Sequence, residues 1–189
     1  MSTATGSNLV ASVRQRLRNL AASRNEDFGL VLTRFANQRL LFRLSQTTHR
    51  NRFLLKGATL FAVWRDEPHR PTRDLDLLGF GDSDVAAVAD VFREVCATAV
   101  EPDGLVFAPD TLQASRIRDD QEYEGVRVAL TATLGNARIP LQVDVGFGDA
   151  VFPEPIEVSV AGLIGFSEAR LTAYPKEAVV SEKLHAMAT

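Results

Sequence analysis

Asp74 and Asp76 form the pair of residues in this chain whose type and spacing best suit metal chemistry. They alternate with Leu75 and Leu77, and side chains two residues apart in a strand point to the same face of a sheet. Two carboxylates aimed at one point repel each other unless a hard divalent cation lies between them. The pair therefore suggests a metal site, although such pairs also occur on solvated strand edges and among glycosyltransferases.

Asp144 offers a third carboxylate on a second predicted strand. In the segment Leu141–Val145 (LQVDV) the apolar residues share one face and Asp144 lies on the other. If the two strands are neighbours, the three aspartates converge on a site for Mg²⁺ or Mn²⁺. Two such ions about 3.5 to 4 Å apart would stabilise both the entering and the leaving oxygen of a phosphoryl transfer. The alternative is a strand with one solvated face.

Lys56 and Gly57 follow directly on the apolar run Phe53–Leu55 and precede a predicted helix. A glycine lets backbone amides approach a phosphate, and a helix N-terminus favours negative charge. The lysine adds a point charge for a triphosphate. The segment is thus a candidate nucleotide-binding turn, and the other interpretation is that Gly57 simply makes a turn.

The elements that must position these residues follow from hydrophobic periodicity and turn signals. Helices are predicted over residues 8–22, 28–44 and 58–65, after the cap at 82–84, and from about 176 onward. Strands are predicted over 72–80, 111–116, 126–134 and 139–147, with a hairpin turn at Gly135-Asn136. The order predicts an α+β (mixed α/β) domain with a mixed sheet flanked by helices and an N-terminal helical segment.

Composition limits the class of protein. A chain of 189 residues suits one domain, no apolar run is long enough to span a bilayer, and the N-terminus lacks the apolar core of a signal peptide. Cys96, the single cysteine, excludes an internal disulfide and lies on an apolar helical stripe, so we assign it to the core. The histidines share no metal-ligand spacing: His49, His69 and His185. We expect a cytoplasmic protein without a membrane partner.

The net charge of −3 conceals a segregation. Residues 1–65 carry eleven Lys or Arg against two acids, whereas residues 66–189 carry ten against twenty-two. A chain so divided can offer a cationic face to a polyanion such as RNA. The alternative is a set of solvated helix faces. The candidate RNA contacts are five arginines: Arg34, Arg39, Arg43, Arg50 and Arg52.

Four spaced motifs together resemble the AbiEii/AbiGii nucleotidyltransferase toxin family. They are FLLKGATL at 53–60, RPTRDLDL at 70–77, VDV at 143–145, and YPKE at 174–177 with SEKLHA at 181–186. The resemblance runs from about residue 50 to the end, in the family's order. It implies a polymerase-β-like nucleotidyltransferase fold, a nucleoside triphosphate and Mg²⁺ as requirements, and a bacterial toxin paired with a cognate antitoxin. Some such toxins modify the 3′ end of tRNA and so block translation.

The resemblance also implies roles for individual residues. Asp74 and Asp76 would bind the metal, and Asp144 would be the third carboxylate and the base toward an attacking hydroxyl. The triphosphate would be held by the 56–59 turn and by lysines near the C-terminus: Lys56, Gly57, Ala58, Thr59, Lys183 and Lys176. Thr72 lies two residues before Asp74, so a phosphate on its hydroxyl would crowd the metal site; we take it as a candidate site of inhibitory phosphorylation.

Two departures from the family pattern accompany these roles. Ala58 replaces the second Gly or Ser of the usual Gly-Gly or Gly-Ser pair, which removes a hydroxyl but keeps a backbone amide. Family members also commonly continue into a helical region beyond residue 189. We therefore expect three parts: a basic helical segment over 1–50, a nucleotidyltransferase core over 51–172, and the start of a C-terminal helical region, apparently truncated, over 173–189.

Three functions remain open at this stage. The leading one is transfer of a nucleotide from an NTP to RNA by a toxin, with tRNA as the expected acceptor. The second is transfer to a small molecule or to a protein hydroxyl. The third is a non-catalytic protein of the same fold that binds nucleotide, RNA or an antitoxin.

Overall fold

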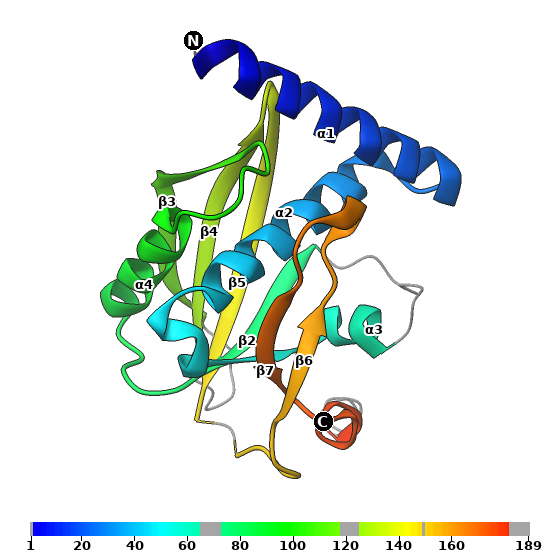
Figure 1. The fold of residues 1–189 in the computed structure, drawn as a ribbon. Helices are drawn as coiled ribbons and strands as arrows, with labels where there is room; N and C mark the ends of the chain where they lie inside the picture. The colour runs from blue at the N-terminus through cyan, green and yellow to red at the C-terminus, as the bar shows by residue number, and fades with distance from the viewer. Residues whose placement is uncertain (1, 65–72, 118–124, 149, 182–189) are drawn as a thin grey trace.

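The computed structural model describes residues 2–64, 73–117, 125–148 and 150–181 (Figure 1). A seven-stranded mixed sheet lies at its centre, in the order β3-β4-β5-β2-β1-β7-β6. The helices are α1 (Ser2–Arg24), α2 (Phe28–Ser45), α3 (Thr59–Trp64) and α4 (Val85–Ala97), with 3-10 turns η1 (Thr48–Arg52) and η2 (Leu163–Gly165), and residues 176–181 are helical as well. The strands are β1 (Phe53–Lys56), β2 (Asp74–Gly79), β3 (Leu105–Ile117), β4 (Gly125–Leu134), β5 (Ala137–Phe147), β6 (Ile156–Val160) and β7 (Ala169–Ala173). The predicted mixed α/β class is confirmed.

Parallel and antiparallel pairs alternate around β2. The strand runs parallel to β5 and antiparallel to β1, while β4 and β5 form an antiparallel hairpin. β1 also touches β7 in parallel at one residue pair, Leu55 with Ala173. The centre of the sheet therefore brings together segments that are far apart along the chain, with β2 and β5 in direct contact.

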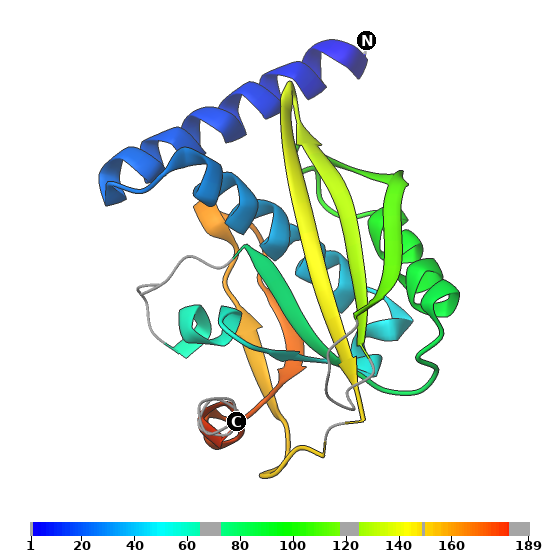
Figure 2. The ribbon, with the colours of Figure 1, turned by 180° about the vertical axis from the view of Figure 1, so that it is seen from behind.

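One face of the sheet forms the core. Six inward residues at the centre of β2, β4 and β5 are at most 1% exposed: Leu75, Leu77, Val126, Val128, Val143 and Val145. Helices α2 and α4 cover this face in Figure 1, and in the view from behind β2, β4 and β5 lie in front of α2 (Figure 2). Apart from Leu78 and Gly125, which are buried, the outward residues of the same strands are half-buried or exposed. The period-two alternation of the sequence thus separates a core face from an open face.

Helix α2 is enclosed on two sides, because α1 contacts it on one side and β5 and β7 on the other. Asp27 caps it by accepting a hydrogen bond from the Leu30 amide at 3.0 Å. The helix extends one residue beyond the predicted range of 28–44; its apolar residues Val31, Leu32 and Phe35 are buried, whereas Phe42 is half-buried. A helix in this position has little surface left for charged side chains.

Arg39 and Arg43 on α2 are buried around one carboxylate. Their side chains are 0% and 7% exposed, and that of Asp103 is 2% exposed. Asp103 Oδ2 accepts from Arg39 Nε at 2.8 Å and from Arg43 Nη1 at 2.7 Å. The expectation that these two arginines contact RNA is therefore wrong, because both are buried in ion pairs that hold α2 against the segment that precedes β3.

The β4–β5 hairpin ends against α1. Gly135, at the predicted turn, has a φ of +60°, and a Cβ added there would lie 3.0 Å from Val10 Cγ1 of α1. Figure 1 shows the tip of the hairpin meeting this helix. The N-terminal helix thus packs on the sheet through the end of its longest hairpin.

The strand prediction was incomplete. β3 begins at Leu105 rather than near residue 111, and its register against β4 shifts between Ala108 and Gln113. β6 and β7 were not predicted at all. Of the described helices, none is long and apolar enough to cross a membrane.

Candidate active site

The structure brings the three predicted aspartates together on the open face of the sheet. In the parallel β2–β5 pair, Asp76 lies directly beside Asp144 and Asp74 beside Gln142. Paired residues on neighbouring strands share a face, and Asp74 shares it with Asp76 because one residue, Leu75, separates them. Asp74 is exposed, Asp76 is half-buried, and the Asp144 side chain is 21% exposed. The carboxylates are thus accessible from solvent at one place.

Four charged residues line up across four adjacent strands at this place. Arg127 of β4 pairs with Asp144 of β5, Asp144 with Asp76 of β2, and Asp76 with Lys56 of β1. We call these four residues the charged row. A cation lies at each end and two carboxylates in the middle, so the row is electrically balanced while concentrating negative charge at its centre.

Arg127 is the member of the row that sequence analysis missed. Its Nε donates to Asp144 Oδ1 and its Nη2 to Asp144 Oδ2, both at 2.8 Å. This two-pronged hydrogen bond to Asp144 raises the pKa of the Arg127 guanidinium, and the negative charge of Asp74 acts in the same direction. The third carboxylate is therefore already engaged by an internal cation.

Gly57 lies directly against Asp76. Its φ is +70°, and a Cβ at this position would lie 2.1 Å from Asp76 Oδ2, far inside van der Waals contact. Only a residue without a side chain fits such a close approach. The turn therefore presents backbone, rather than a side chain, next to a carboxylate of the charged row, as a phosphate-binding turn requires.

Lys56 extends over the centre of the site. Its ammonium lies 3.6 Å from where a Cβ on Gly146 would be, although Lys56 belongs to β1 and Gly146 to β5. The same group lies 5.7 Å from the centroid of the Tyr174 ring. The missing side chain at Gly146 leaves room for a lysine that reaches across β2, and this places its charge close to the aspartates.

The remaining nucleotide-binding candidates are less clearly positioned. Thr59 begins α3, and its Oγ1 is buried with no hydrogen-bond partner in the described part of the chain. The Ala58 carbonyl accepts from the Phe61 amide at 3.1 Å. Lys176 lies against α3, with its ammonium 5.6 Å from the centroid of the Trp64 ring. Thr72 and Lys183 fall outside the described residues, as do His69 and His185.

The donor chemistry of the site fits a hard divalent cation. Carboxylate oxygens are the ligands that Mg²⁺ and Mn²⁺ prefer, and Asp74, Asp76 and Asp144 supply them from one face. Among the described residues, however, no three acidic, His or Cys side chains are arranged to ligate a single ion. Asp144 already accepts hydrogen bonds from Arg127 and Gln142, so it can ligate an ion only through the lone pairs that these bonds leave open, or after one of them breaks.

Two of the five predicted RNA contacts remain near the surface. Arg50 is 42% exposed and makes a long contact of 3.4 Å with Glu157, and Arg52 lies beside it in η1, half-buried. Arg34 is 17% exposed and paired with Glu26 at 2.6 Å. The cationic surface of the N-terminal segment is therefore smaller than its charge count indicates.

Cys96 belongs to the core. It is buried in α4, and desolvation raises the pKa of its thiol to about 11 despite the nearby Arg43 charge. A thiol with such a pKa is almost entirely protonated at neutral pH and is a poor nucleophile. The predicted structural role of Cys96 agrees with this environment.

Comparison with known proteins gives one family and two structures. The model of a family described as "Nucleotidyl transferase AbiEii toxin, Type IV TA system" matches residues 39–189. The crystal structure of JHP933 from Helicobacter pylori shares 13% identity and a TM-score of 0.52, over 82% of this chain and 56% of that one. A putative nucleotidyltransferase from H. pylori gives 13% identity and a TM-score of 0.51, over 82% and 57%. No curated protein sequence matches the chain.

These similarities identify the fold. At 13% identity they say nothing about individual side chains, but a shared arrangement over 82% of the chain shows that its fold is that of these two structures. The chain spans a little over half the length of either structure.

Proposed function

Because the chain belongs to the AbiEii nucleotidyl transferase toxin family of type IV toxin–antitoxin systems, we propose that it transfers a nucleotide from an NTP to RNA, at the 3′ end of tRNA. One observation carries the proposal: the β2–β5 register sets Asp76 beside Asp144, and Gly57 presents its backbone against Asp76. Metal-binding carboxylates and a phosphate-binding turn are the two parts that this reaction needs in contact.

The reaction assigns a task to each of these residues. The oxygen of the acceptor hydroxyl forms a bond to the α-phosphorus of the NTP, the bond from that phosphorus to the bridging oxygen breaks, and pyrophosphate leaves. Asp144 takes the proton of the hydroxyl. Lys56 and the 57–59 turn hold the phosphates. Divalent ions bound by Asp74, Asp76 and Asp144 would neutralise the charge that develops on the phosphoryl oxygens.

The biological role follows from the acceptor. A tRNA whose 3′ end carries an added nucleotide cannot be aminoacylated, so the activity blocks translation and arrests growth in the cytoplasm. A cognate antitoxin counteracts it in the cell. Membership of a type IV toxin–antitoxin family supports the role as a toxin and the antitoxin partner.

One observation favours a second candidate function. Arg127 engages both oxygens of Asp144 at 2.8 Å, an arrangement that would suit a non-catalytic protein binding nucleotide, RNA or antitoxin through a neutralised site. Transfer to a small molecule or to a protein hydroxyl uses the same chemistry with another acceptor. The acceptor and the catalytic state are therefore tested together.

The test is incubation of the protein with labelled NTPs, Mg²⁺ and total RNA. We expect label on tRNA with the wild type, none with Asp76→Asn, and wild-type labelling with Asp110→Asn, a matched change at an exposed aspartate of β3. Label on small molecules but not on RNA would show that RNA is not the acceptor. Equal labelling by wild type and Asp76→Asn would show that the charged row is not the catalytic site.

A further inference from the structure

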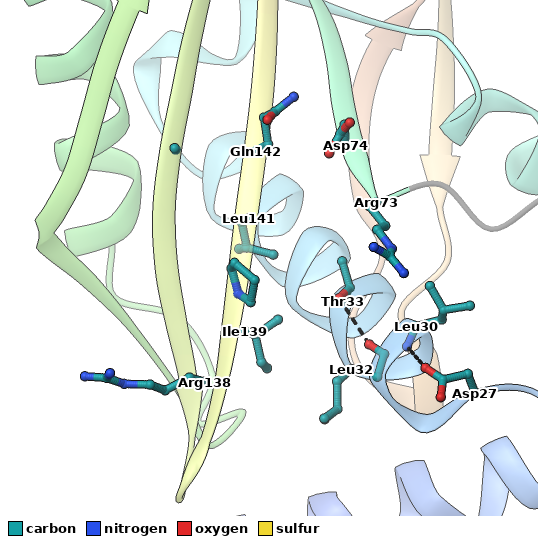
Figure 3. A pocket seen from close by; sticks show the side chains of 13 residues that line it. Asp27, Leu30, Leu32, Thr33, Arg73, Asp74, Arg138, Ile139, Leu141 and Gln142 are labelled. Atoms are coloured by element: carbon teal, nitrogen blue, oxygen red, sulfur yellow. Dashed lines mark hydrogen bonds between the residues drawn. The ribbon is translucent and has the colours of Figure 1, made fainter.

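A pocket of about 460 Å³ opens beside the charged row, where β2 begins. The first turns of α2 form one wall and β5 forms the other, and Figure 3 shows Thr33 of α2 opposite Ile139 and Leu141 of β5. Sequence analysis did not single out this place. Its volume lies within the roughly 300 to 1,000 Å³ typical of pockets for small ligands.

The pocket and the charged row share residues. Asp74 and Gln142 line the pocket, and they are the paired residues next to Asp76 and Asp144 in the β2–β5 register. Gln142 Nε2 also donates to Asp144 Oδ2 at 3.2 Å. A ligand in the pocket would therefore touch Gln142, whose side chain contacts the third carboxylate directly. The Lys56-Gly57 turn, in contrast, lies across the strands from Asp144, on β1.

The edge of β5 adds backbone groups to the pocket wall. β5 pairs with β2 only from Gln142 onward, whereas residues 137–141 pair with β4 on the other edge. No strand of the described part pairs with this stretch on the pocket side. Every second residue of a strand directs its N–H and C=O to a given edge. The pocket wall can therefore form hydrogen bonds with a flat polar ring such as a nucleobase.

The charges of the pocket argue against a polyphosphate ligand. Arg73 and Arg138 are balanced by Asp27 and Asp74 among the lining residues. Asp27 already satisfies the N-terminus of α2 by capping Leu30, so that helix end offers no vacant anion site. The interior walls are aliphatic. These features suit an uncharged nucleoside that is connected to phosphates outside, and they do not suit a free triphosphate.

We propose that this pocket receives the terminal nucleoside of the single-stranded 3′ end of the RNA acceptor. The proposal rests on the proposed function and divides the site in two: the NTP lies on the Lys56-Gly57 side and the acceptor nucleoside beside Gln142, with Asp144 between them. Arg73 extends between β2 and α2 in Figure 3, where it would contact the last backbone phosphate. Arg138 points outward from the rim, toward phosphates farther along the strand.

The test fills the pocket from a residue that is not part of the charged row. Ala129 lines the pocket and is exposed, so Ala129→Trp places a large side chain in it. Thr133→Trp is the matched control, because Thr133 lies four residues on in the same strand, on the same face, and outside the pocket lining. Binding of a 5′-fluorescein-labelled single-stranded RNA with a free 3′ hydroxyl is followed by fluorescence anisotropy in the absence of NTP.

We expect Ala129→Trp to weaken RNA binding by about tenfold and Thr133→Trp to leave it within about twofold of wild type. The same RNA with a 3′ phosphate should bind the wild type more weakly, since the neutral pocket disfavours an added anion. Equal RNA affinity of the two tryptophan variants would overturn the proposal. So would equal affinity of the wild type for the two RNA ends.

A second pair of variants tests the pocket even if Ala129→Trp does not fold. Arg73→Glu should weaken RNA binding, and Arg93→Glu, on α4 behind the sheet, should not. Pocket-dependent RNA binding without any transfer to RNA would contradict only the proposed function. Transfer to RNA with unchanged binding by Ala129→Trp and Arg73→Glu would contradict only the pocket.

Discussion

Gly57 is required to be glycine both by its backbone conformation and by its contact with the Asp76 carboxylate. Its positive φ alone would favour glycine, but Gly81 has a φ of +87° and nothing within 4 Å of its Cβ position. At Gly57 the same position lies 2.1 Å from Asp76 Oδ2. The two glycines therefore share a backbone requirement and differ in one contact, which makes them a matched pair.

Gly57→Ala should impair both folding and transfer. The positive φ costs about 1 to 3 kcal/mol at either glycine, whereas the clash at Gly57 also displaces Asp76. Moving a catalytic carboxylate by about 1 Å lowers rates by roughly a hundredfold. We expect that loss in nucleotidyl-transfer assays for Gly57→Ala and near wild-type transfer for Gly81→Ala. Similar transfer rates for the two variants would show that the contact with Asp76 is unimportant.

Arg127 should set how tightly the site binds a divalent cation. Arg127→Ala removes the competitor for Asp144, so we expect Mn²⁺ affinity to rise by about tenfold in a calorimetric titration. Stability should change by about 1 kcal/mol or less, because the Arg127 side chain is 45% exposed and solvent screens its ion pair. Arg170→Ala, which breaks an exposed pair with Glu168, is the control. Weaker Mn²⁺ binding in Arg127→Ala would contradict the competition.

The sequence predicted the aspartates because alternation of polar and apolar residues is local. The pairing of Arg127 with Asp144 can also be derived from the sequence. A two-residue turn at Gly135-Asn136 pairs Leu134 with Ala137, and counting outward along the hairpin pairs Arg127 with Asp144. The β2–β5 register cannot be counted in this way, since no short turn joins these two strands. Only the folded chain shows which residue lies beside Asp144.

At the scale of elements, α2 shows how tertiary contacts override a charge pattern. Its arginines resemble the solvated face of an amphipathic helix, but the helix is covered by α1 on one side and by the sheet on the other. The counter-ion Asp103 lies about sixty residues away in sequence, so no local pattern predicts it. β6 and β7 were missed for a related reason: each is five residues long and gains its strand character from its partner.

Asp103→Asn should destabilise the fold. The substitution leaves the buried Arg43 without a counter-charge and leaves Arg39 only its ion pair with the part-exposed Glu101 at 3.2 Å, which costs roughly 3 to 5 kcal/mol. Urea unfolding at neutral pH measures this loss. Asp110→Asn, at an exposed position of β3, should leave the free energy of unfolding nearly unchanged. A loss below about 1 kcal/mol for Asp103→Asn would mean that water reaches the arginines.

The same network predicts an acid sensitivity. Burial acts to raise the pKa of the Asp103 carboxyl, but hydrogen bonds from Arg43 and Arg39 hold this pKa below its usual value. A lowered pKa in the folded state gives stability that is present above the unfolded value of about 3.9. It is lost as the pH falls through the lower folded-state pKa. The wild type should therefore lose more unfolding free energy than Asp103→Asn between neutral pH and pH values below about 4.

At the scale of the whole molecule, charge segregation is real in the sequence but only partly available to a ligand. Arg39 and Arg43 are internal and Arg34 is paired with Glu26. Arg50 and Arg52 precede β1, at the end of the strand away from Lys56. Of the five predicted arginines, these two remain the candidates for peripheral RNA contacts.

Replacing Arg50 and Arg52 by Gln should flatten the salt dependence of RNA binding. For single strands, the slope of log affinity against log salt falls by roughly 0.7 for each phosphate that the protein no longer neutralises. Anisotropy titrations at several salt concentrations measure the slope. Arg93→Gln with Arg170→Gln, two exposed and locally paired arginines, should leave it unchanged. An unaltered slope in the first variant would show that Arg50 and Arg52 neutralise no RNA phosphate and are ordinary solvated residues.

The contact between Gly135 and Val10 ties the first helix to the chemistry of the sheet. β5 runs without interruption from the hairpin turn past the pocket wall to Asp144, and the turn at its start packs against α1. A partner that binds α1 and shifts it would therefore displace β5 and change the position of Asp144 relative to the pocket. Such a partner would act on the reaction without binding at the pocket or the charged row.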